Sequence, residues 1–314
     1  MISTIINNVN CGAGELLGTG TNHCPIDIKR ITTLEFSKRS YKYDDATGDT
    51  LAGIRTAQQS EDVIILQGVV ETTIDTADDN YTTRTGSGIE KLSGKNPIGF
   101  TFTFDNGVYF SKALQELISY GQYNLSMYDS EGNKFLVETK SNEFKGFACF
   151  QVNAGAYMPS NGADAAQQTV RLQLNREEYD KRISWITSDN LDYTADVDLD
   201  GYNDLNLSIA TAVNLTTDVI FDVYSVADNK IVAITGLAKE DFLFTLNGVE
   251  DVIVSLTPST TIQGRYTLVS TTTLATSDII TLKTWDSALL SAIIDVEGVL
   301  YKSNTDTFTV TVAV

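Results

Sequence analysis

Short runs of alternating apolar and polar residues, separated by turns rich in Gly, Asp, Asn and Thr, recur along most of this chain. Residues 98–104 read Ile-Gly-Phe-Thr-Phe-Thr-Phe and are followed by Asp105, Asn106 and Gly107. A period of two places every second side chain on one face of a strand, and Asn-Gly is a strong turn signal. Because only four of 314 residues are prolines, this pattern predicts a mainly all-β protein.

One segment departs from that period. Apolar residues recur there at the spacing of an amphipathic helix, at Phe110, Leu114, Leu117 and Ile118. Ser111 is expected to cap the start of this helix, and Gly121 to adopt the left-handed conformation that ends many helices. We therefore predict one helix over about residues 111–120, packed against a β-sandwich or half-barrel. The four apolar residues are expected to belong to the core rather than to a functional site.

Length and composition predict two domains. A chain of 314 residues corresponds to about two domains of roughly 150 residues each. Residues 1–22, rich in Gly, Asn and Thr, predict an extended arm before a β domain over residues 23–186. The segment 187–210 has six aspartates and no Lys or Arg, which is typical of a solvated connector.

Residues 211–314 are predicted to form an immunoglobulin-like β-sandwich that lacks the usual disulfide. Short apolar runs recur there at the spacing expected for such a domain, with turns such as Asn247-Gly248 between them. The expected strands are Val219–Val226, Ile231–Ile234, Phe242–Leu246, Val252–Leu256, Arg265–Ser270, Ile279–Leu282 and Phe308–Val312.

Charge and histidine content argue against several classes of function. The 22 basic and 41 acidic residues give a net charge of −19, which repels nucleic acid and anionic membranes. His23 is the only histidine, and histidine is the commonest general acid or base near neutral pH. We therefore expect no enzyme, no catalytic residues and no required cofactor. The sequence shows neither a signal peptide nor the roughly 18 uninterrupted apolar residues of a membrane span, so no membrane contact is expected.

The cysteines do not predict a metal site. Cys11, His23 and Cys24 offer soft zinc ligands, but a structural zinc needs four, and neighbouring residues of an extended chain point to opposite sides. With Cys149 the chain has three cysteines, an odd number for a disulfide framework, so reduced thiols are expected.

A candidate calcium loop lies in the acidic segment. Asp196, Asp198 and Asp200 occupy alternate positions, followed by a glycine and Asp204, and carboxylates spaced in this way surround calcium in EF-hand and dockerin loops. The twelfth position, where a standard loop has a bidentate Glu, is Leu207. Two interpretations remain: a truncated structural calcium site that stiffens the domain junction, or a plain acidic linker.

A second motif, over residues 88–96, superficially resembles a phosphate-binding loop. The motif requires four residues between its glycines and Ser or Thr after the lysine. Here five residues separate Gly88 from Gly94, and Asn96 follows Lys95. We therefore predict a surface turn.

The order of elements in the first 186 residues resembles a family of tailed-bacteriophage structural proteins and is similar to that of tail tube (major tail) proteins. The resemblance rests on an arm, strands, Phe100–Phe104 with the turn Asp105–Gly107, the helix at 111–120, a hairpin and Gln168–Leu174. The second domain resembles immunoglobulin-like modules that decorate phage tails and capsids. The residues that carry this second resemblance are Ile234–Leu237, Asp241-Phe242 and Asn247-Gly248.

The resemblance implies a virion subunit that assembles with itself in the host bacterial cytoplasm. Hexameric rings would stack into a tube, contact other virion proteins and let DNA pass without specific binding. The immunoglobulin-like domain would lie outside, where it could meet the host surface. Two alternatives stay open: a capsid decoration or head or tail fibre protein, and a carbohydrate-binding or adhesin module.

Overall fold

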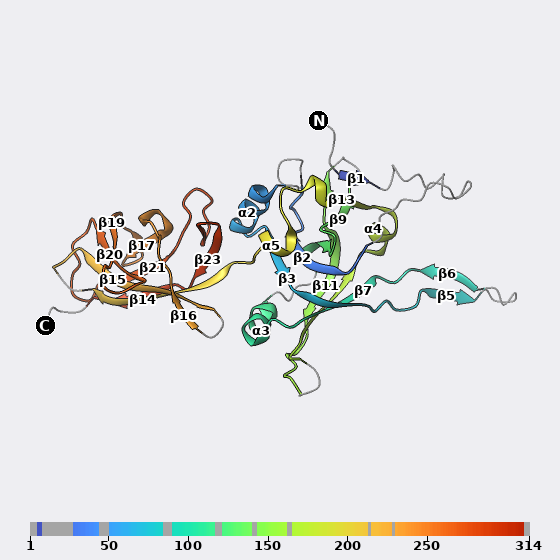
Figure 1. Cartoon of the computed structure of the whole chain (residues 1–314), viewed down its shortest axis with the longest axis horizontal. Coiled ribbons are helices and arrows are strands. Elements are labelled where there is room, and N and C mark those ends of the chain that lie inside the picture. The colour runs from blue at the N-terminus through green and yellow to red at the C-terminus, as the bar shows by residue number, and fades with distance from the viewer. Residues whose placement is uncertain are drawn as a thin grey trace. The chain divides into compact units, whose positions relative to one another are not determined.

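The computed structural model describes residues 5–7, 28–43, 50–83, 90–116, 121–139, 143–161, 165–212, 215–227 and 230–310. The chain divides into two compact units, which Figure 1 shows in ribbon form. The first comprises Met1–Ala57 and Asp62–Asp200, and the second Gly201–Val314 with Gln58–Glu61. Strands dominate both units, so the protein is mainly all-β, as the alternating sequence predicts.

The first unit combines strands with several short helices. Its helices are α2 (Leu51–Gln59), α3 (Gly107–Glu116), α4 (Arg176–Lys181), α5 (Ala195–Asp198) and the 3₁₀ helix η2 (Ser188–Asn190). Its strands are β1 (Ile5–Asn7), β2 (Ile31–Lys38), β3 (Val63–Gln67), β4 (Val69–Ile74), β5 (Asn80–Thr83), β6 (Glu90–Gly94), β7 (Ile98–Phe104), β8 (Tyr123–Asp129), β9 (Lys134–Glu138), β10 (Phe144–Lys145), β11 (Phe147–Ala154), β12 (Gln168–Leu174) and β13 (Ile183–Ile186).

Strand pairing closes the first unit into a barrel. Strand β8 pairs along one edge with β2, which pairs with β3. At Gly68, whose φ is +80°, the chain turns into β4, and β4, β7, β12 and β11 pair in that order. Strand β11 then returns to the other edge of β8, with Phe147 opposite Leu125. Strands β9, β13 and β1 extend the sheet from that same edge.

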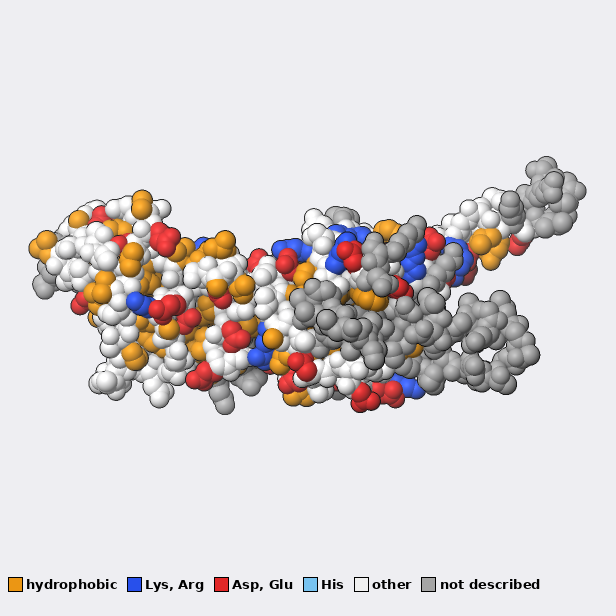
Figure 2. Space-filling model, turned by 90° about the horizontal axis from the view of Figure 1, so that it is seen from above, with side chains coloured by type: hydrophobic (Ala, Val, Ile, Leu, Met, Phe, Trp, Pro, Cys, Tyr) orange, Lys and Arg blue, Asp and Glu red, His pale blue; other side chains and the backbone are white. Residues whose placement is uncertain are grey.

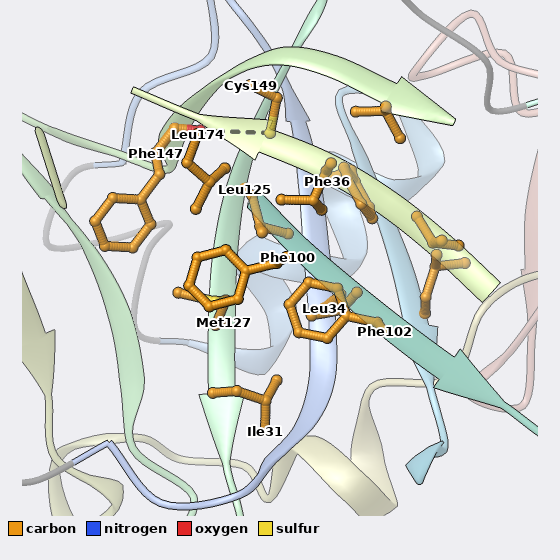
Figure 3. Packing of buried hydrophobic residues seen from close by; sticks show 14 of the residues in the cluster. Ile31, Leu34, Phe36, Phe100, Phe102, Leu125, Met127, Phe147, Cys149 and Leu174 are labelled. Carbon is orange, nitrogen blue, oxygen red and sulfur yellow. Dashed lines mark hydrogen bonds between the residues drawn. The ribbon is translucent and has the colours of Figure 1, made fainter. Parts of the chain in front are cut away.

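Alternate side chains of these strands fill the barrel. Phe100, Phe102 and Phe104 of β7 point inward with at most 4% of their surface exposed, which confirms the alternation predicted for this run. Figure 3 shows this core from close by. Each fully buried side chain of this size contributes about 1.5–3 kcal/mol. The residues that meet them from other strands include Leu34, Phe36, Leu125, Met127, Phe147, Val170, Leu172 and Leu174.

A second apolar cluster covers the outer face of β2, β8 and β9. Ile54 and Ala57 of α2 lie in it, together with Tyr193, Ala195 and Leu199 from the segment around α5. Strands β2 and β8 are consequently buried on both faces. The sequence predicted a single helix, and that was wrong, because α2, α4 and α5 also form on this unit.

The predicted helix exists but begins earlier. Helix α3 spans Gly107–Glu116, and Leu114 is buried in the core, whereas residues 117–120, with Leu117 and Ile118, lie outside the described part. Ser111 is not the cap: it lies within the helix and its hydroxyl donates to Gln168 Oε1 at 2.6 Å. Gly121 has the left-handed φ that was expected, +67°.

The acidic connector over residues 187–210 was predicted wrongly. Its first half folds into the first unit as η2 and α5, where Tyr193 and Leu199 are buried. Its second half is strand β14 (Asn203–Ala212) of the second unit. The aspartate count concealed a period of two in Leu205, Leu207 and Ile209, all of which face the core.

The second unit is a sandwich of two sheets. One sheet runs in the order β19-β20-β15-β14-β23-β22 with β16 beside β15, and the other β18-β17-β21-β24. Besides β14, the strands are β15 (Asp218–Ala227), β16 (Lys230–Ala233), β17 (Phe242–Leu246), β18 (Val249–Glu250), β19 (Ile253–Pro258), β20 (Arg265–Ser270), β21 (Ile279–Thr284), β22 (Ile293–Val296), β23 (Val299–Ser303) and β24 (Asp306–Thr309), with the 3₁₀ helix η3 (Lys239–Asp241). Each of the predicted strands overlaps one of these, whereas β14, β18, β22 and β23 were not predicted.

The predicted N-terminal arm, residues 1–22, lies mostly outside the described residues. Within it, strand β1 pairs antiparallel with β13, Ile5 opposite Ile186. Cys11, His23 and Cys24 also lie outside the described part.

Candidate functional site

The four aspartates of the candidate calcium loop do not share one arrangement. Asp196 on α5 accepts hydrogen bonds from the hydroxyls of Thr32 at 2.6 Å and Thr33 at 3.1 Å. Asp198 accepts from the backbone N–H of Thr194 at 2.7 Å and so closes the turn of α5. Asp200 ends the first unit, and Asp204 lies on β14 of the second. Within the described ranges, no group of three or more His, Cys, Asp or Glu side chains is placed to hold a metal ion.

We expect calcium to leave the thermal stability of the protein unchanged, because Asp196 and Asp198 already bind protein donors. The measurement is the melting temperature in about 1 mM calcium, compared with the melting temperature in a chelator. A calcium concentration of about 1 mM occupies even weak sites such as those of extracellular modules. A rise in melting temperature on adding calcium that Asp198→Ala abolishes would restore the calcium interpretation.

Cys149 is a structural residue. Its side chain is fully buried in the barrel, and its Sγ lies 3.7 Å from the carbonyl oxygen of Phe147 (Figure 3). Burial raises the pKa of this thiol far above its ordinary value. The neutral thiol is a poor nucleophile, so this cysteine is not a candidate for covalent chemistry.

A buried ionic cluster lies between the barrel and its covering helices. Glu35 of β2 and Lys134 of β9 have no exposed surface, and Lys134 Nζ lies 2.9 Å from Glu35 Oε2. Tyr43 and Tyr128 donate their hydroxyls to the two carboxylate oxygens, and Tyr128 also meets the hydroxyl of Tyr193 at 3.0 Å. Burial, then the charge of Glu35, raises the pKa of both Tyr43 and Tyr128, so they remain neutral donors.

This cluster is structural rather than catalytic, because a substrate has no route to fully buried groups. The ammonium also lies 4.1 Å from the ring centre of Tyr43, a cation–π contact. Sequence reasoning missed the cluster. Thr33, Glu35 and Ser37 alternate with apolar residues in β2 and read as a solvent-facing edge, but α2 and α5 cover that face.

A long hairpin projects from the barrel. The pairing of β4 with β7 ends at Ile74 opposite Phe100, and a second ladder, β5 with β6, begins at Asn80 opposite Gly94. We call residues 76–97 the hairpin arm; its tip, residues 84–89, lies outside the described part. Figure 1 shows its strands extending away from the body of the first unit, and Figure 2 shows the same projection as a space-filling surface. Where the arm begins, its two backbone segments lie close together, because a Cβ on Gly99 would lie 2.0 Å from the carbonyl oxygen of Asp75.

Large apolar side chains are exposed on this arm. Tyr81 of β5 and Leu92 of β6 stand directly opposite one another in the ladder, 58% and 43% exposed. Ile74, where the arm begins, is 62% exposed. A two-stranded hairpin by itself is only marginally stable in water, so three or more strands or a packing partner are normally needed. The arm therefore exposes apolar side chains on an element of low intrinsic stability.

Ion pairs surround the base of the arm. Arg176 of α4 binds Asp79 at 2.7 Å, and Lys95 binds Asp180 of α4 at 3.1 Å. Arg171 of β12 pairs with Asp75. The segment that resembled a phosphate loop therefore takes part in this arm: its residues 90–94 form β6, not the predicted surface turn. The run of aromatic and β-branched residues Tyr81, Thr82 and Thr83 was the available signal for a strand here.

No protein-family model and no curated protein matches the sequence. In the part of the chain that the structure describes, no helix combines the length and apolar character needed to cross a bilayer.

Proposed function

We propose that this chain is a structural, non-enzymatic subunit of a tailed-bacteriophage virion and that it forms the tail tube. Copies of the first unit would join into closed rings of six, and stacked rings would enclose the path of DNA. The second, immunoglobulin-like unit would lie on the exterior of the tube and be available to other virion proteins or the host surface.

The observation that carries this proposal is the exposed cross-strand pair Tyr81 and Leu92 on the hairpin arm. An exposed apolar pair on a two-stranded ribbon favours coverage by another chain. The chain supplies a natural partner, a second copy of itself, because closed homo-oligomers repeat one interface around an axis. The order of strands and helix in the first 186 residues, which resembles that of tail tube proteins, supports the ring form of this assembly.

The net charge of −19 fits a conduit better than a binder of DNA. A tube that passes DNA must not hold it, and a protein with excess carboxylates offers few cations to replace the counterions of phosphates. We expect no measurable affinity of the assembled protein for duplex DNA at physiological salt.

The test compares assembly of the wild type with the double variant Tyr81→Ser/Leu92→Ser. We expect rings or tubes with an axial channel by negative-stain electron microscopy of the concentrated wild type. The variant should sediment as a monomer with an unchanged melting temperature, because the two side chains are exposed in the single chain. A matched control is Ile231→Ser/Val249→Ser, which removes two apolar side chains of the second unit that are 75% and 71% exposed.

The outcomes separate the alternatives. Monomers, dimers or trimers of the wild type that attach to capsid shells would favour a decoration or fibre protein. Binding to a glycan array through the second unit would favour an adhesin. Equal assembly of the wild type and the hairpin variant would contradict the role given to Tyr81 and Leu92.

A further inference from the structure

The hairpin arm is joined to the barrel through a break in its strands. The last backbone hydrogen bond on the barrel side runs from the N–H of Asp75 to Gly99 at 2.8 Å. Residues 76–79 and 95–97 belong to no strand. Side chains bridge this stretch, with Asn96 Nδ2 donating to the carbonyl of Asp78 at 2.5 Å and Asn80 Nδ2 donating to Asn96 Oδ1 at 3.1 Å. Without a continuous ladder, the backbone alone does not fix the direction of the arm.

Helix α4, which faces this break, is anchored to the barrel. Its residue Glu178, 8% exposed, accepts hydrogen bonds from Lys145 Nζ and from the backbone N–H of Ala148, both at 2.7 Å. Tyr179 packs against the rings of Phe100 and Phe147. Because one side of α4 is fixed in this way, charges on its other side are held at defined positions.

Charged side chains of α4 bind both segments of the break, the one that leads into the hairpin arm and the one that returns from it. Arg176 Nη1 lies 2.7 Å from Asp79 on the outgoing chain, and its Nε lies 3.3 Å from Asp180. The same carboxylate oxygen of Asp180 lies 3.1 Å from Lys95 on the returning chain. The guanidinium of Arg176, planar and with several donors, can serve two carboxylates at once. We call Asp79, Lys95, Arg176 and Asp180 the ionic clasp.

We propose that Arg176 is a positioning residue that sets the direction of the hairpin arm through the ionic clasp, and that high salt releases the arm. The side chains of Arg176 and Asp79 are 26% and 16% exposed, so this pair is the stronger half of the clasp. Those of Lys95 and Asp180 are 47% and 33% exposed, so salt weakens this second pair more. The Debye length falls from about 8 Å at physiological ionic strength to about 3 Å at 1 M. This inference rests on the proposed function in one respect only: if copies of the chain assemble through the hairpin arm, release of the arm would weaken that assembly.

The direct test is the distance between two spin labels, one on the arm and one on the barrel unit. Labels are attached at Glu90→Cys on β6 and Lys112→Cys on α3, both exposed positions, after Cys11→Ser and Cys24→Ser; Cys149 is buried and does not react. The labelled protein is diluted with unlabelled protein so that only distances within one chain are measured. In wild type at low salt we expect one narrow distance distribution, broadening at least about two-fold in Arg176→Gln or in about 1 M NaCl.

Arg265→Gln is the matched control, because it breaks a pair of similar geometry with Asp222 in the second unit, at 2.7 and 2.8 Å. It should leave the distribution narrow. Asp79→Asn, which removes the arm's partner of Arg176 and leaves the barrel residues intact, must reproduce the broadening if Arg176→Gln also lowers barrel stability. A distribution that stays narrow in Arg176→Gln, Asp79→Asn and high salt would overturn the proposal. The measurement needs no assembly, so a failure here is distinguishable from a failure of the proposed function.

Discussion

Replacing Lys134 with methionine is expected to destabilise the barrel by about 3–5 kcal/mol. The substitution keeps the length and apolar stem of the side chain but removes the ammonium that lies 2.9 Å from Oε2 of the fully buried Glu35. Tyr43 and Tyr128 would still donate to the carboxylate. Two neutral donors do not replace a full positive charge in a fully buried site, so the carboxylate would remain largely uncompensated.

The measurement is urea unfolding followed by tryptophan fluorescence in a Trp285→Phe background. Each unit has one of the two tryptophans, so the remaining Trp185, packed in the barrel core, reports on the barrel alone. The double variant Glu35→Gln/Lys134→Met should lose less than the sum of its single variants, because it leaves no unpaired buried charge.

A surface pair gives the control for this effect. Lys38 and Asp62 lie 3.1 Å apart, but their side chains are 49% and 37% exposed, and such pairs contribute about 0–1 kcal/mol. Lys38→Met should therefore change the free energy of unfolding little. A loss below about 1 kcal/mol in Lys134→Met would mean that the buried ion pair does not stabilise this fold.

The second large effect is expected at Gly146, between β10 and β11. Here the chain crosses from the edge of β9 to the edge of β8 and closes the barrel. A Cβ at this position would lie 2.6 Å from the backbone carbon of Leu125 and 2.8 Å from its nitrogen and oxygen. Backbone cannot rotate away as a side chain can, so Gly146→Ala must move one strand and should cost about 3 kcal/mol, the upper end for overpacking.

Gly94→Ala is the matched control, since a Cβ there meets nothing within 4 Å. We expect it to change the unfolding free energy by no more than about 0.5 kcal/mol. The same fluorescence experiment serves for both variants. Equal, small effects of Gly146→Ala and Gly94→Ala would show that a Cβ fits between Gly146 and the backbone of Leu125 without moving a strand.

The buried ion pair and Gly146 both contribute to the rigidity of the barrel from which the hairpin arm projects. The ion pair and its tyrosines tie β2, β8 and β9 to the covering segment around Tyr193, while Gly146 permits the barrel to close. Helix α4, on which the ionic clasp depends, packs on this same barrel through Tyr179. A loosened barrel would therefore be expected to loosen the arm, and assembly would fall with barrel stability.

Local pattern predicted β7 of the first unit and seven strands of the second unit. The run at 98–104 and those of the second unit show a period of two that depends only on which face of a strand meets a core. The helix around Leu114 was predicted from the spacing of its apolar residues. Its first residue was predicted wrongly, because the Ser111 hydroxyl donates to Gln168 on β12 instead of capping the helix. Such long-range partners leave no trace in local spacing.

Polar residues were where sequence reasoning failed, for one physical reason. The aspartates of residues 187–210 were predicted to lie in a solvated connector, because an isolated carboxylate prefers water, and the buried ion pair of Glu35 was not predicted. The partners of these carboxylates, Lys134 for Glu35 and Thr32 for Asp196, are distant in sequence and meet them only in the fold. The same holds for Arg176 and Asp79 at the base of the arm.

The sequence by itself determined that the chain is built from strands, that two units form, and that alternate residues of runs such as 98–104 face a core, because burial of every second residue is a local requirement. Only the tertiary structure decided that the barrel closes through Gly146, that charged and polar groups are buried beneath α2 and α5, and that residues 76–97 project as an arm. These features depend on contacts between residues far apart in the chain, whose geometry no local pattern specifies.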